Sequence, residues 1–187
     1  MSPFEFLSVA LSFVLGLAVT LLLTSLLTAF RARKVARMRW LPLVWAAYVL
    51  IMQFDLWWEV FGLSSLEKWN VGAFVLLLVL ALSLFAAGGL VLPTGTEGYP
   101  SDLALYFDED GRWGVAMVAV FLVVGNVANV ALFDLGPLSG MNVLNTLGVV
   151  LVAMVVGIRH TAIRAVGTVG YGIYLVAYLW TFVPRTY

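Results

Sequence analysis

The stretch FLSVALSFVLGLAVTLLLTSLLTAF, residues 6–30, decides the fold class. It contains no Asp, Glu, Lys or Arg. About 20 apolar residues in a helix cross the ~30 Å hydrocarbon core of a bilayer, where lipid cannot satisfy unpaired backbone groups. The run is too long for the apolar core of a signal peptide and ends in a basic block without a cleavage-site pattern. It therefore predicts a retained first transmembrane helix.

Five further apolar runs follow, at residues 40–60, 69–92, 113–133, 141–158 and 166–183. Each is continuously apolar, whereas the strands of a membrane β-barrel alternate apolar and polar residues. The 187-residue chain is 63% hydrophobic and only 11% charged, about half the charge of a soluble domain. We expect an all-α fold, a polytopic bundle of six transmembrane helices that forms a single domain over residues 1–187.

Lysine and arginine are unevenly divided between the two ends of this predicted bundle. Two, Lys68 and Arg185, fall at one end, and eight fall at the other. Cytoplasmic loops carry the excess of basic residues, so we expect the loop at 31–39 and the inner loop at 93–112 in the cytoplasm, and both termini outside. Except for Arg112, the basic residues of the inner side either bind anionic lipid headgroups or only set the topology. The eight are Arg31, Arg33, Lys34, Arg37, Arg39, Arg112, Arg159 and Arg164.

The inner loop at 93–112 contains a short segment with helical character. Ser101 is a candidate N-cap for a helix over 102–107 that lies at the membrane surface. We expect Leu103, Tyr106 and Phe107 to face lipid. A turn at 110–111, an Asp-Gly pair, is then expected to end the segment before the next span.

Two carboxylates lie on one face of the predicted helix at 40–60. Asp55 and Glu59 are one helical turn apart, toward the outer end of the span. An ionised carboxylate at that depth needs a partner, water or a proton. Asp55 could therefore exchange protons or hold a cation, with Glu59 at the outer mouth. The competing interpretation, given equal weight, is a boundary pair that water simply solvates.

Amide side chains are expected at the same depth on three helices. With the two carboxylates they predict one outward-facing polar pocket, because amide and carboxylate oxygens suit protons, water or hard cations. The alternative, which we favour for the asparagines, is that they hydrogen-bond between helices. Tyrosines on one face of 166–183 could reach the same region, although ordinary packing is the simpler interpretation. The predicted site comprises Gln53, Asp55, Glu59, Asn126, Asn129 and Asn145.

The last span contains TVGYG at residues 168–172. This pentapeptide resembles the selectivity filter of potassium channels, in which backbone carbonyls of four such loops line a pore. The flanking sequence lacks the pore helix before it and a full span after it. A potassium-selective pore is therefore only a minor alternative, and close packing of helices at the glycines is the favoured interpretation.

A second resemblance involves residues 39–113. Arg39-Trp40-Leu41-Pro42-Leu43-Val44-Trp45, then Gln53 and Trp57-Trp58, and later Arg112-Trp113 after an acidic loop are similar to an uncharacterised family of small bacterial multi-span proteins. The resemblance implies a multi-pass protein of the bacterial inner membrane. It implies no activity.

Several classes of function are disfavoured by composition. The chain has no cysteine and one histidine, His160, which removes thiolate nucleophiles, most zinc sites and paired haem ligands. No HExxH, GxSxG, GxGxxG or Walker motif is present, and the zero net charge does not favour nucleic acid. We expect no enzymatic activity, no cofactor and no metal centre.

Two functions then remain as expectations. The first is a channel or transporter for protons or a small cation that uses the outward-facing polar site. The second is a non-catalytic transmembrane subunit or scaffold of a larger membrane complex, in which the polar residues only lock helices together. Besides the lipid bilayer, the expected partners are further copies of the chain in a homo-oligomer, or the other subunits of such a complex.

Overall fold

The computed structural model describes residues 2–65, 69–95 and 99–182. Regular structure in these residues is helical, apart from one isolated bridge between Arg37 and Asp102. The elements are α1 (Pro3–Ala32), α2 (Trp40–Glu59), the 3-10 turn η1 (Val60–Ser65), α3 (Val71–Val91), α4 (Leu103–Tyr106), the π-helical turn η2 (Phe107–Gly111), α5 (Arg112–Phe133), α6 (Gly140–Gly157) and α7 (Thr161–Thr181).

Six helices among the described residues are long and apolar enough to cross a membrane, which confirms the expected all-α fold with six candidate spans. Their outer surfaces are apolar: Phe13 is 68% exposed, Ile173 68% and Trp180 74%. Exposed apolar area on this scale suits contact with lipid rather than water. The predicted and observed helix bounds differ most at α7, which begins at Thr161 rather than at residue 166.

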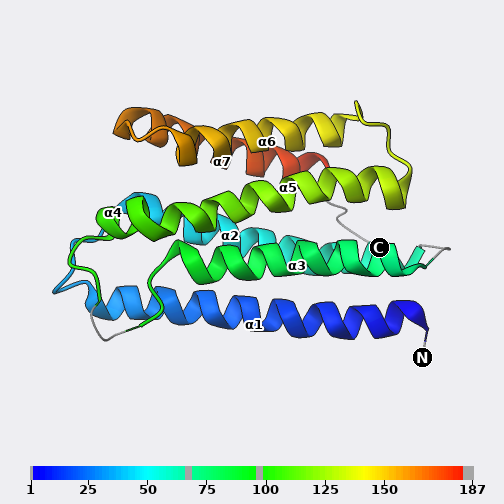
Figure 1. Cartoon of the computed structure of the whole chain (residues 1–187), viewed down its shortest axis with the longest axis horizontal. Coiled ribbons are helices and arrows are strands. Elements are labelled where there is room, and N and C mark those ends of the chain that lie inside the picture. Colours follow the sequence, from blue (N-terminus) through cyan, green and yellow to red (C-terminus); the bar gives the residue numbers. More distant parts are fainter. Residues whose placement is uncertain (1, 66–68, 96–98, 183–187) are drawn as a thin grey trace.

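The six long helices form one bundle whose consecutive members alternate in direction (Figure 1). Packing runs around a ring in the order α1, α3, α5, α6, α7 and α2, and α2 also packs on α1 and α3. One end of the bundle carries the connection between α1 and α2, the α4 segment and the turn between α6 and α7 (Figure 1). We call this the basic end, because Arg31, Arg33 and Lys34 lie there. The start of α1, η1 and the α5–α6 loop form the opposite end.

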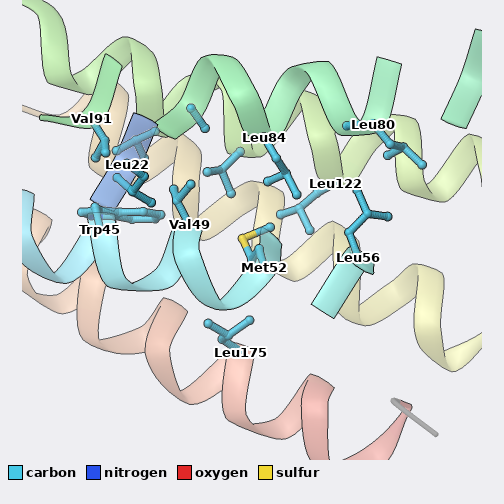
Figure 2. Packing of buried hydrophobic residues seen from close by; sticks show 14 of the residues in the cluster. Leu22, Trp45, Val49, Met52, Leu56, Leu80, Leu84, Val91, Leu122 and Leu175 are labelled. Atoms are coloured by element: carbon cyan, nitrogen blue, oxygen red, sulfur yellow. The ribbon is translucent and has the colours of Figure 1, made fainter. Parts of the chain in front are cut away.

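The centre of the bundle is built on one face of α2. Trp45, Val49, Met52 and Leu56 point from α2 into the core, where Leu84 of α3 meets them (Figure 2). Trp45 is fully buried, and its indole Nε1 donates a hydrogen bond of 3.0 Å to the Thr168 hydroxyl of α7. A buried indole N–H needs such an acceptor, so this bond fixes the position of α7 against α2.

The TVGYG segment at 168–172 lies in the middle of α7 and is helical. A potassium filter requires an extended loop with its carbonyls directed into a pore, so the potassium-pore alternative has no support in this fold. The small residues serve packing instead, because a side chain at Gly172 would overlap the Tyr48 hydroxyl.

The segment before α5 corrects the expected inner loop. Asp102, not Ser101, is the N-cap of α4, and its carboxylate accepts the Ala104 N–H at 2.8 Å. This hydrogen bond holds the pKa of Asp102 below its usual value, and the Arg39 guanidinium, 3.5 Å from the carboxylate, contributes a smaller lowering. Leu103 and Phe107 are buried rather than directed to lipid.

The helix also continues through η2 into α5 without the turn expected at 110–111. A π-helical turn inserts an extra residue into a helix without leaving its backbone unpaired, which is how the acidic segment joins the span.

Helices α3 and α5 approach closely at Gly114. A Cβ at this position would lie 2.6 Å from the backbone nitrogen of Val91 and 2.9 Å from the Ala87 carbonyl oxygen. We expect Gly114→Ala to lower the stability of the bundle by roughly 1–3 kcal/mol, because backbone atoms cannot move aside as a flexible side chain can. Thermal unfolding followed by tryptophan fluorescence measures this effect.

Gly16→Ala is the matched control for that substitution. A Cβ at Gly16, also within a long helix, would meet no atom within 4 Å. Alanine at this position should be neutral or stabilising by up to about 1 kcal/mol, because alanine favours the helix. Equal losses of stability in the two variants would contradict the close approach at Gly114.

Candidate functional site

A cavity of about 380 Å³ lies inside the bundle, toward the end opposite the basic end. All six long helices contribute to its wall, from Leu11 of α1 to Tyr178 of α7. Most of the lining is aliphatic or aromatic. Four of the predicted site residues, Asp55, Glu59, Asn129 and Asn145, are among the residues that line it.

The two carboxylates of α2 enter the cavity from one wall, one helical turn apart. Both are half-buried. The Tyr178 hydroxyl donates a hydrogen bond of 2.9 Å to Oε1 of Glu59. By contrast, Oδ1 of Asp55 is buried and finds no hydrogen-bond partner among the described residues. Asp55 is therefore the member of the pair with free capacity to accept a proton or a cation.

The asparagines on the facing wall are buried and partly bonded to each other. Asn129 donates its amide to Oδ1 of Asn142 at 2.9 Å, and Asn142 donates to the Gly136 carbonyl at 3.0 Å, which ties α5 to α6. Oδ1 of Asn145 accepts the Tyr174 hydroxyl at 3.1 Å. Thus Asn129 and Asn145 contribute both to the cavity wall and to helix packing.

Gln53 and Asn126 do not lie at this cavity, contrary to the expected single pocket. Gln53 is completely buried, and its amide donates to the Leu84 carbonyl of α3 at 3.2 Å. Two residues along a helix rotate a side chain by about 200°, so Gln53 and Asp55 point in opposite directions. Asn126 donates to the Thr146 hydroxyl at 3.3 Å and lines a separate hollow with Pro137.

The tyrosines of α7 reach the site, although ordinary packing was the simpler interpretation of their spacing. Tyr174 and Tyr178 line the cavity and bond to Asn145 and Glu59, respectively. Their rings are 6.2 Å apart, and the Phe182 ring lies 6.0 Å beyond that of Tyr178. A helical face of aromatic residues is a detectable signal in the sequence, but it does not by itself show which hydroxyl meets which acceptor.

An aromatic cluster lies between the cavity and the basic end, along the contact of α2 and α7. Tyr171 is fully buried, its ring lies 4.8 Å from that of Trp45, and its hydroxyl contacts the Met52 sulfur at 3.2 Å. The Tyr48 hydroxyl donates to the Thr168 carbonyl at 3.3 Å. The residues Trp45, Tyr48, Met52 and Tyr171 therefore pack together along this contact, and Met52 also lines the cavity.

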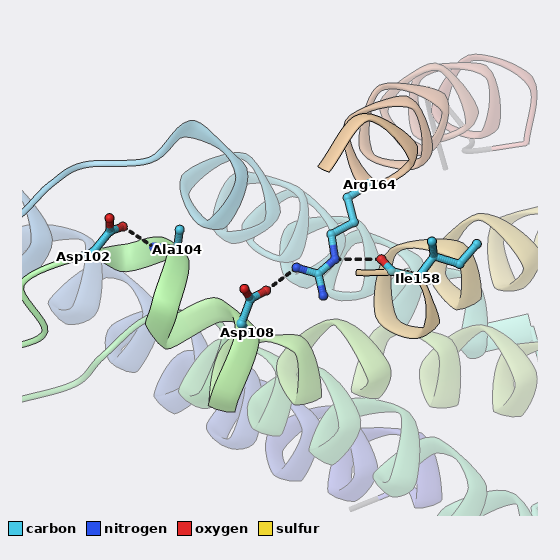
Figure 3. A network of polar contacts seen from close by, with 5 residues as sticks. All are labelled: Asp102, Ala104, Asp108, Ile158 and Arg164. Atoms are coloured by element: carbon cyan, nitrogen blue, oxygen red, sulfur yellow. Dashed lines mark hydrogen bonds and ion pairs between the residues drawn. The ribbon is translucent and has the colours of Figure 1, made fainter. Parts of the chain in front are cut away.

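Arg164 does not fit the lipid-headgroup interpretation of the basic residues, although its role in setting the topology stays a prediction. Its side chain is only 7% exposed and forms an ion pair with Asp108 of η2 (Figure 3). Its Nε donates to the Ile158 carbonyl at 2.9 Å, and its guanidinium lies 5.9 Å from the Phe107 ring centroid. Because these contacts enclose the guanidinium, Arg164 joins α7 to the segment before α5 instead of reaching lipid headgroups.

The other predicted headgroup residues are exposed, and their contact with lipid stays a prediction. Arg33 covers the Phe30 ring at 3.9 Å, while Arg39 pairs with Asp102. The exposed residues are Arg31, Arg33, Lys34, Arg37, Arg39 and Arg159.

The chemistry available in the cavity is that of two acids, amides and tyrosine hydroxyls. Within the described residues, no group of three or more His, Cys, Asp or Glu side chains is placed to hold a metal ion. No protein-family model, curated protein or solved structure matches this chain. Its function is therefore inferred from the geometry of the cavity.

Proposed function

We propose that this chain is a membrane transporter or channel for protons or a small cation, and that Asp55 and Glu59 form its ion-binding pair. The observation that carries the proposal is a cavity between the helices with two carboxylates and, in the part of its lining that the structure describes, no basic side chain. Such a site attracts positive charge and repels anions.

The different bonding of the two carboxylates supports distinct roles. A buried acceptor atom without a donor is unfavourable, most of all when its group is charged. A proton or a cation on Asp55 would satisfy Oδ1, which lacks a partner. Glu59 already accepts the Tyr178 hydroxyl, so it is positioned by α7 and strengthens the negative field beside Asp55. Asp55 is therefore the proposed ion-exchanging residue.

We further propose that the basic end faces the cytoplasm of a bacterial cell and that the cavity opens outward. Exposed arginines and Lys34 cluster at the basic end, as the cytoplasmic side of an inner-membrane protein requires. Lys68 and Arg185, the two basic residues assigned to the other side, lie outside the described residues. In this orientation both termini are outside.

The test of this function is proton flux into liposomes that contain the purified protein and an internal pH-sensitive dye. A pH gradient with a potassium diffusion potential supplies the driving force. Flux well above that of protein-free liposomes is expected, with sodium and potassium gradients tested in parallel. A leak equal to that of protein-free liposomes for all three ions would contradict the proposal.

A second candidate function is that of a non-catalytic subunit in a larger membrane complex. It is favoured by the bonding of Gln53 and Asn142, whose side chains join helices instead of facing the cavity as free groups. Native mass spectrometry after extraction from the original membrane in mild detergent separates the two candidates. A monomer or homo-oligomer agrees with the transporter, and a defined hetero-complex agrees with the subunit.

A further inference from the structure

The cavity is much larger than a simple ion requires. One water molecule occupies about 30 Å³ in the liquid, whereas this cavity has about 380 Å³. The volume falls in the range of sites that enclose small organic molecules, about 300–1,000 Å³. A bare sodium ion or a proton would leave most of the space to be filled by something else.

The apolar walls of the cavity are not suited to hold water. They are formed by side chains such as Leu56, Leu80, Phe121, Leu122 and Leu175. Such side chains offer water no hydrogen-bond partners, so this part of the wall favours contact with apolar groups. The apolar part of the cavity therefore fits the body of an organic ligand.

The polar wall selects the charge of that ligand. Asp55 and Glu59 carry the acidic groups, and no Lys, Arg or His lines the cavity among the described residues. Tyr174, Tyr178 and Phe182 present aromatic rings in sequence along α7. Aromatic faces attract ammonium groups, and this attraction is strongest where water is excluded.

We propose that the ligand of this cavity is an amphipathic organic cation, with its ammonium head beside Asp55 and Glu59 and its apolar body against the leucine-rich wall. The inference rests on the proposed function, because it names the substrate class of the same site. In this inference the transported cation is an organic cation rather than a small inorganic ion. Asp55 binds this cation in exchange for a proton.

Gly125 offers a way to test the size of the site apart from its charge. It lies on α5 in the cavity wall, and a Cβ there would meet only Nδ2 of Asn145, at 3.9 Å. The Cβ of a leucine at this position would meet no backbone atom, and we expect the rest of the side chain to occupy part of the cavity. Gly125→Leu therefore removes volume and leaves both carboxylates in place.

The experiment measures binding of benzyltrimethylammonium to the full chain in lipid nanodiscs by isothermal titration calorimetry. Saturable binding to the wild type is expected. Asp55→Asn should weaken it by at least about tenfold, because a charge-assisted contact is lost. Gly125→Leu should weaken it by about tenfold or more through lost space, and Gly125→Ala by less. Asp110→Asn, a change of the same chemistry at an exposed position of η2, should leave binding unchanged.

Neopentylbenzene, which replaces the ammonium nitrogen by carbon, is the neutral competitor and should not displace the cation. Thermal unfolding of each variant verifies that it is folded. Absence of saturable binding to the wild type, or equal affinities in Asp55→Asn, Gly125→Leu and the wild type, would overturn the inference. Displacement by neopentylbenzene would overturn it as well.

The liposome assay keeps this inference distinct from the proposed function. Proton flux without organic-cation binding would overturn only the substrate class. Binding of benzyltrimethylammonium without any proton flux in liposomes, even under a gradient of that cation, would support the site and contradict transport.

Discussion

Asp55→Asn is expected to reduce proton or cation flux through the reconstituted protein by at least about tenfold. Asparagine has nearly the same shape as aspartate but cannot take up or release a proton, and it carries no charge for a cation. Oδ1 of Asp55 is buried without a partner among the described residues, so the group lost is the one with free binding capacity. Flux is measured with the internal pH-sensitive dye, at equal amounts of inserted protein.

Two further variants make that result specific. Asp110→Asn removes an exposed carboxylate from η2 that does not line the cavity, and should leave flux unchanged. Glu59→Gln should have a smaller effect than Asp55→Asn, because glutamine still accepts the Tyr178 hydroxyl. Wild-type flux in Asp55→Asn would remove Asp55 from the proposed mechanism.

Asp108→Ala is expected to destabilise the bundle by about 2–4 kcal/mol. Its carboxylate is the ion-pair partner of Arg164, whose side chain is 7% exposed while that of Asp108 is 45% exposed. Removing the acid leaves a buried guanidinium without its counter-charge, and breaking buried pairs in this way is strongly destabilising. Because Asp108 is partly exposed, we expect the loss of stability to lie toward the lower end of the range for broken buried ion pairs.

Thermal unfolding followed by intrinsic fluorescence measures this loss, because the chain has seven tryptophans and no cysteine for a thiol-reactive dye. Glu109→Ala is the control, since Glu109 is the exposed neighbour of Asp108 in the same turn and exposed substitutions usually change stability by less than about 0.5 kcal/mol. The double variant Asp108→Ala with Arg164→Leu should be less destabilised than the sum of its single variants. Equal stability of the Asp108 and Glu109 variants would show that the ion pair contributes nothing.

Sequence periodicity was most informative about side chains that belong to one helix. Asp55 and Glu59 are four residues apart, so any helix places them on one face, and they do line one cavity. The same argument places Tyr174 and Tyr178 on one face of α7, and both line the cavity. Gln53 and Asp55 were expected together because they lie at the same depth. Depth along the helix axis, however, does not show in which direction around that axis a side chain points.

The basic residues illustrate a second limit of sequence reasoning. Arg164 and Arg159 lie in the same short basic stretch, yet Arg159 is exposed and Arg164 is buried against η2. The difference depends on the acidic segment 107–111 continuing as a helical turn into α5. No local sequence pattern predicts that the helix continues through this segment, since an Asp-Gly pair ordinarily favours a turn.

By itself the sequence determined that this protein is a bundle of six long apolar helices, because backbone groups in an apolar solvent must be paired within each segment. It also determined which carboxylates share a face of α2, since the helical period alone sets that relation. Only the tertiary structure decided that Asn129 and Asn145 meet them across a cavity while Gln53 and Asn126 turn away. The rotation of each helix and the choice of its neighbours come from side-chain packing among segments far apart in the chain, and that packing depends on the complementary shapes of whole helices.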